Sequence, residues 1–81
     1  MSEHLSPEDA EQLIQVVSTW YAQQLMTERR AALPDPERMA ALQEAMAACA
    51  ADRRALRDAG PRERAEIVAR YAARARELDA G

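Results

Sequence analysis

Proline and glycine occur at few places in this chain, and their positions divide it into three uninterrupted stretches. The prolines are Pro7, Pro34, Pro36 and Pro61, and one of the two glycines, Gly60, directly precedes the last of them. Proline is tolerated at the first position of a helix but disrupts a helix interior. Each stretch between these positions is therefore free to form one long helix.

The composition favours helices over strands. Alanine is the commonest residue and all eleven basic residues are arginine, both strong helix formers, while β-branched residues are few. We therefore predict an all-α fold, a small three-helix bundle whose helices cover about residues 7–32, 36–58 and 61–78. The connections are short and contain Pro and Gly, so neighbouring helices should run antiparallel. The 81 residues suffice for one domain, 1–81, with residues 1–5 frayed.

The predicted helix ends carry capping residues. Ser6 can cap the first helix and Asp35 the second, because their side-chain oxygens accept hydrogen bonds from free backbone N–H groups of a first turn. A proline follows each of them at the first helical position. Gly60 can end the second helix in the left-handed conformation that glycine adopts without strain.

The second and third predicted helices each have one apolar face. In the second helix, residues at alternating intervals of three and four form a coiled-coil-like seam: Met39, Leu42, Met46, Cys49, Arg53 and Leu56. In the third helix, the same spacing connects Val68, Tyr71, Ala75 and Leu78. We expect both rows to face the core.

The first helix has a wider apolar face than one neighbour requires. At about 100° per residue, this face covers half the circumference and consists of Leu13, Ile14, Val16, Val17, Trp20, Tyr21 and Leu25. Either it packs between the other two helices, or its Val16/Trp20 edge meets a second chain. Met26 falls outside this face and should be exposed. Because tryptophan is a favoured interface anchor, we predict that Val16, Trp20 and Met26 bind a partner.

Three polar residues fall on the predicted interior faces. Gln24 and Glu28 lie on the apolar face of the first helix, and Arg53 lies within the seam of the second. A buried polar group needs a partner, so one hypothesis pairs Arg53 with Gln24 or Glu28. Alternatively, all three reach solvent. A third hypothesis makes them a polar pocket for a small anionic ligand, in a ligand-binding bundle or a small all-helical enzyme.

Arginines gather around the second predicted turn. Arg53, Arg54 and Arg57 are followed by Arg62 and Arg64, with acidic residues interleaved. This Arg53–Arg64 cluster is interpreted as a solvated face or as the electrostatic rim of a partner contact. A nucleic-acid-associated regulator is the alternative, although the net charge of −3 weighs against it.

No residue pattern predicts catalysis, a cofactor or a metal site. Cys49 is the only cysteine and His4 the only histidine, so neither a disulfide nor a cysteine-based metal site can form within the chain. The N-terminal residues do not resemble a signal peptide, and no apolar run approaches membrane-spanning length. We therefore expect a cytoplasmic protein without a membrane partner.

The small size of the chain bears on its assembly. A domain of 81 residues buries a modest share of its surface, and a second copy often completes the core. We predict a non-catalytic protein–protein interaction module that forms a homodimer and serves as an adaptor, an accessory subunit or an inhibitor of a larger protein.

Overall fold

A computed structural model describes residues 7–80 of the chain. Three helices account for nearly all of these residues: α1 (Pro7–Arg30), α2 (Pro36–Asp58) and α3 (Pro61–Ala80). The described part contains no strand, which confirms the predicted all-helical class with three helices. The predicted fraying of residues 1–5 and the cap at Ser6 lie outside the described residues.

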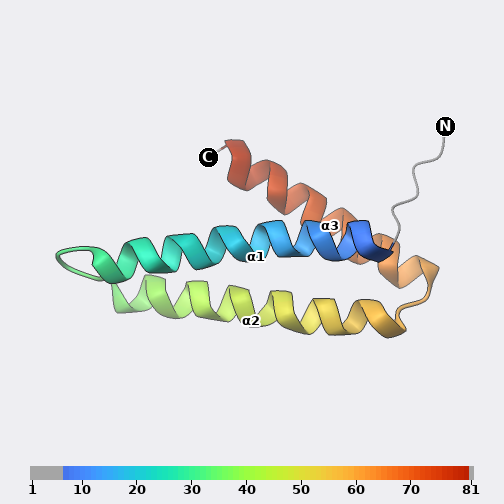
Figure 1. Ribbon diagram of the computed structural model, residues 1–81, viewed down its shortest axis with the longest axis horizontal. Helices are drawn as coiled ribbons and strands as arrows, with labels where there is room; N and C mark the ends of the chain where they lie inside the picture. Colours follow the sequence, from blue (N-terminus) through green and yellow to red (C-terminus); the bar gives the residue numbers. More distant parts are fainter. Residues whose placement is uncertain (1–6, 81) are drawn as a thin grey trace.

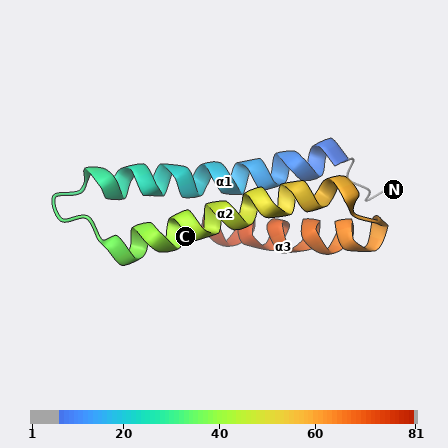
Figure 2. The same cartoon turned by 90° about the horizontal axis from the view of Figure 1, so that it is seen from below.

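The helices form a hairpin with a third helix across one end. α1 and α2 run antiparallel side by side, and α3 crosses near the end where α1 begins and α2 stops (Figure 1). Seen from below, α1 lies at one edge and α3 at the opposite edge (Figure 2). α3 packs on α1 more extensively than on α2. The resulting shape is long and flat, 49 × 25 × 16 Å.

α1 ends at Arg30, two residues before the predicted end. The Ala31 N–H donates to the Glu28 carbonyl oxygen at 3.1 Å, a tightened last turn. The Glu28 carboxylate then accepts the Asp35 N–H at 2.9 Å. Pro34 disfavours helical geometry at Leu33, so the chain leaves the helix and turns back toward α2.

The two later helix starts differ in how they are capped. Asp35 caps α2 as predicted, since its carboxylate accepts the backbone N–H groups of Glu37 at 3.0 Å and Arg38 at 3.3 Å. Gly60 does not take the predicted left-handed conformation. Instead, Ala59 leaves α2 in an extended conformation, and the Gly60 carbonyl accepts the Arg64 N–H at 2.9 Å. Gly60 therefore starts α3 rather than closing α2.

The core lies where all three helices meet. α1 contributes Ala10, Ile14 and Val17, α2 contributes Cys49 and Leu56, and α3 contributes Ile67 and Tyr71. The predicted seams account for most of the buried positions of α2 and α3. At the other end of the hairpin only α1 and α2 pack together, through the buried Leu25 and Leu42.

Candidate functional site

One face of α1 carries a regular row of exposed side chains, here called the α1 stripe. Its members recur at intervals of three and four, within about 100° of the helix circumference, and all are exposed: Asp9, Gln12, Val16, Thr19, Gln23, Met26 and Arg30. Val16 is 53% exposed and Met26 is 49% exposed, unusual values for large apolar side chains. The predicted exposure of Met26 is confirmed. This spacing is that of a coiled-coil contact row.

The middle of the α1 stripe, from Gln12 to Met26, lies in a stretch without charges. The sixteen residues from Gln12 to Thr27 include no acid or base, although 31% of the chain is charged. The surface of a solvated helix ordinarily carries charges, whereas the centre of a protein interface is depleted of them. The spacing of the apolar residues does not reveal this signal, because it consists in the absence of charged residues from the stretch.

Trp20 lies beside the α1 stripe, partly buried, with its ring edge-to-face against Tyr21 at a centroid distance of 5.7 Å. A groove of about 470 Å³ runs along this edge of α1, and Ala75 and Leu78 of α3 form its other wall. Val16 and Trp20 both line the groove. The structure thus brings these two predicted residues together on one accessible surface.

The predicted polar trio is not assembled. Arg38, not Arg53, reaches the α1 residues: it donates to the Gln24 Oε1 at 3.4 Å and pairs with the Glu28 carboxylate at 3.4 Å. Arg53 instead donates to the Gln15 Oε1 at 3.0 Å. This excludes the hypothesis that Arg53 pairs with Gln24 or Glu28.

The geometry of the hairpin explains why this pairing does not form. The turn fixes the register of α1 against α2, so Glu28 lies opposite Arg38 and Gln15 lies opposite Arg53. Arg53 is 15 residues from Arg38, about 22 Å along a helix. In this register Arg53 lies too far along α2 to reach Gln24 or Glu28.

The Arg53–Arg64 cluster splits into two kinds of residue. Arg53 donates to Gln15, and the Arg64 guanidinium donates to the Ala59 carbonyl at 3.2 Å. The buried Nε of Arg64 has no hydrogen-bond partner among the described residues. The remaining members are exposed, and within residues 7–80 they form no ion pair: Arg54, Arg57 and Arg62.

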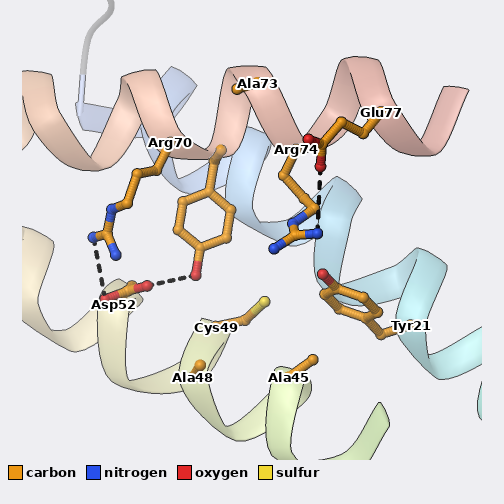
Figure 3. A pocket seen from close by; sticks show the side chains of 10 residues that line it. Tyr21, Ala45, Ala48, Cys49, Asp52, Arg70, Ala73, Arg74 and Glu77 are labelled. Carbon is orange, nitrogen blue, oxygen red and sulfur yellow. Dashed lines mark hydrogen bonds and ion pairs between the residues drawn. The ribbon is translucent and has the colours of Figure 1, made fainter. Parts of the chain in front are cut away.

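A second cleft of about 380 Å³ separates α2 from α3. Figure 3 shows Arg70 and Arg74 extending from α3 and Tyr21 from α1, with Cys49 between them on α2. The charges in this cleft are already paired. Asp52 pairs with Arg70 at 3.7 Å, and Arg74 pairs with Glu77 at 3.3 Å.

Two side chains that line this cleft, Cys49 and Tyr71, are held in their protonated forms. Burial raises the pKa of the Cys49 thiol above its ordinary value, and a hydrogen bond to Tyr71 offsets only part of this. Burial, and then the hydrogen bond to Asp52, raise the pKa of the Tyr71 hydroxyl well above its ordinary value. A nucleophilic cysteine requires the thiolate, so this environment disfavours nucleophilic chemistry at Cys49.

Comparisons with known proteins do not place the chain in a family. Comparisons with protein-family models, curated proteins and solved structures found no significant match. Across the described residues, no group of three or more His, Cys, Asp or Glu side chains is arranged to hold a metal ion. None of the helices described has the length and apolar character needed to cross a membrane.

Proposed function

We propose that this protein is a small, non-catalytic helical module that binds another protein surface through the α1 stripe and the groove beside Trp20. The observation that supports the proposal is the exposure of Val16 and Met26 on a helix face without charges between Gln12 and Thr27. Such a module serves as an adaptor, an accessory subunit or an inhibitor of a larger protein. Its single, buried thiol suits the reducing cytoplasm.

The energetics of the α1 stripe favour an uncharged, partly apolar partner. Complete burial of a valine or methionine stabilises a complex by about 1.5–3 kcal/mol relative to full exposure. Val16 and Met26 are about half exposed, so each offers roughly half of that. The glutamine and threonine side chains of the stripe can hydrogen-bond across a contact. A partner charge buried against the middle of the stripe, between Gln12 and Met26, would find no counter-charge, at a cost of several kcal/mol.

The surroundings of the stripe supply a polar rim. Gln15, one turn from Thr19 on α1, accepts the hydrogen bond from Arg53, which brings this arginine to the α2 side of the stripe. Arg54 and Arg57 follow on α2 and are exposed. Rim charges chiefly affect association rate and specificity. This position supports the proposal that Arg53, Arg54 and Arg57 form the electrostatic rim of the contact.

A double substitution tests the proposal. Val16→Glu combined with Met26→Glu places two charges on the stripe while leaving the buried core intact. The control is Ala47→Glu, which adds a charge at an exposed position of α2. Tagged versions of the wild type and both variants are used to capture proteins from a lysate of the native host and to capture purified untagged chain.

The test compares the proteins captured by the wild type, by the double variant and by Ala47→Glu. We expect at least one protein, or the chain itself, to be retained by the wild type and by Ala47→Glu but lost from the double variant. Circular dichroism confirms that all three chains are equally helical. If the same proteins bind all three chains, or none binds any, the α1 stripe is not a binding surface.

Nucleic-acid binding is the competing function, favoured by the exposed Arg54, Arg57 and Arg62, which form no ion pair within residues 7–80. It predicts retention on DNA that falls with rising salt concentration, because phosphate contacts release counterions. Changing these three arginines to glutamine should then abolish retention. Arg29→Gln combined with Arg76→Gln is the control, since both residues are exposed and lie outside the cluster. Retention lost equally in both variants would indicate only a general effect of charge.

A further inference from the structure

The two ends of the α1 stripe carry opposite charges. Asp9 is its first member and Arg30 its last, and the residues between them on this face are uncharged. Acidic residues also surround Asp9 in the sequence, and Arg29 precedes Arg30. The stripe therefore has an acidic end, an uncharged middle and a basic end.

This arrangement is self-complementary when reversed. If two copies of the stripe are placed face to face in opposite directions, Asp9 lies opposite Arg30 of the second copy. Val16 then lies opposite Gln23, and Thr19 lies near the two-fold axis. In a parallel arrangement Asp9 would face Asp9 and Arg30 would face Arg30, which places like charges together at both ends.

We infer that the occupant of the α1 stripe is the α1 helix of a second copy, packed antiparallel about a two-fold axis near Thr19 and Trp20. This inference rests on the proposed function of the stripe as a binding surface. A two-fold contact uses the same patch on both copies. The uncharged middle of one stripe would therefore face the uncharged middle of the other. Of the exposed large apolar residues in the described part, only Leu33 lies outside the stripe, in the α1–α2 turn.

The size of the contact indicates the class of interface to expect. From Asp9 to Arg30 the stripe is about 32 Å long, and a helix is about 10 Å wide. The resulting face is smaller than the roughly 800 Å² per partner of standard stable interfaces. Ala75 and Leu78 beside the groove enlarge it only in part. We therefore expect a dimer that forms reversibly, as transient contacts of this size do.

Single cysteine substitutions distinguish the antiparallel arrangement from the parallel one. A disulfide requires Cα atoms within about 7 Å. Thr19→Cys lies near the axis, so two copies cross-link to each other under mild oxidation. Gln12→Cys does not cross-link to itself, because two such positions lie about 22 Å apart in antiparallel helices. It does cross-link to Thr27→Cys when the two variants are mixed. The wild type, whose Cys49 is buried, is the control.

Charge reversal supplies a readout that needs no cross-link. Arg30→Glu places an acid opposite Asp9 of the second copy at both ends of the dimer and raises the dissociation constant about three- to tenfold. Arg29→Glu is a matched control, because Arg29 is also exposed and in the last turn but lies about 100° around the helix. Sedimentation equilibrium measures both constants.

The results separate this inference from the proposed function. A concentration-dependent dimer with the expected cross-links supports both. Cross-linking of Gln12→Cys to itself overturns the antiparallel arrangement. If the chain is a strict monomer that captures a host protein through Val16 and Met26, the inference of a second copy is wrong but the proposed binding function of the stripe is supported. A strict monomer that captures nothing overturns both.

Discussion

The Tyr71 hydroxyl donates a 2.5 Å hydrogen bond to the Asp52 carboxylate and thereby joins α3 to α2. Arg70 reaches the same carboxylate at 3.7 Å. α2 and α3 pack against each other much less than either packs against α1. Asp52 is therefore the principal polar connection that keeps these two helices together.

Removal of the Tyr71 hydroxyl should lower the free energy of unfolding by about 1–2 kcal/mol, because a hydrogen bond to a charged acceptor is lost. Tyr71→Phe keeps the ring in the core, and chemical denaturation measures the change. Tyr21→Phe is the control, since the Tyr21 hydroxyl has no hydrogen-bond partner within residues 7–80. Equal losses in the two variants would show that the Asp52 contact contributes nothing specific.

The same contact predicts a loss of stability in alkali. The folded-state pKa of Tyr71 is raised above its ordinary value of 10.0, so the folded chain holds this proton more tightly than the unfolded chain. Its contribution is fully present below the ordinary pKa and is lost as the pH rises beyond it toward the folded-state value. Unfolding measured from neutral pH to about pH 11 should show a steeper decline for the wild type than for Tyr71→Phe. If stability declined equally with pH in the wild type and in Tyr71→Phe, the alkaline loss would not come from the Tyr71 hydroxyl.

Cys49 should react with thiol reagents only when the chain opens. It is 2% exposed, and burial raises the pKa of its thiol, so both access and the thiolate fraction are low in the folded state. The rate of alkylation should follow the unfolded fraction as denaturant is added. Rapid labelling of the folded chain at neutral pH would show that the core around Cys49 opens without unfolding.

Glu28, at the α1–α2 turn, should contribute more to the free energy of unfolding than Arg38 or Arg53. Its carboxylate accepts the Asp35 N–H at 2.9 Å and pairs with Arg38 at 3.4 Å. Glu28→Ala removes both contacts and should cost about 1–2 kcal/mol. Arg38→Ala removes its exposed pair with Glu28 and a long, exposed hydrogen bond to Gln24, and should cost less than about 1 kcal/mol. Thermal unfolding gives the ranking. Arg53→Ala tests the original pairing, and its loss should be independent of Glu28 in a double-mutant cycle.

Gly60→Ser should stabilise the chain by about 0.5–1 kcal/mol. Gly60 occupies the position before α3 with no left-handed φ, and a Cβ built there meets no heavy atom within 4 Å. Serine restricts the unfolded chain and can cap the first turn of α3. Gly60→Ala, which cannot cap, should gain less. A loss of stability with serine would indicate strain at this turn.

The helices followed from local features of the sequence. Pro36 and Pro61 mark helix starts through a fixed φ, and Asp35 provides its cap from the adjacent residue. The three- and four-residue spacing of Leu42, Cys49 and Leu56 identified the buried face of α2. These features act within one or two helical turns, so a single sequence is enough to predict them.

Contacts between helices were harder to predict. Arg53 has seam spacing, yet its long side chain extends to the exposed Gln15 at the edge of the seam. The connection between Tyr71 and Asp52 depends on how α3 crosses the hairpin, and helix spacing does not determine a crossing. The α1 stripe was visible in the sequence, but its exposure depends on which side of α1 the other helices occupy.

The position of α3 across only one end of the hairpin has a consequence for how the chain opens. Leu25 and Leu42 are held by two helices, whereas Ile14 and Cys49 are held by three. Amide hydrogens near the α1–α2 turn should therefore exchange with solvent through local fraying, while those beside α3 should exchange only when the whole chain unfolds. Met26 and Arg30 lie in the fraying half, so pairing of two copies along α1 would slow exchange most at the end that α3 leaves uncovered.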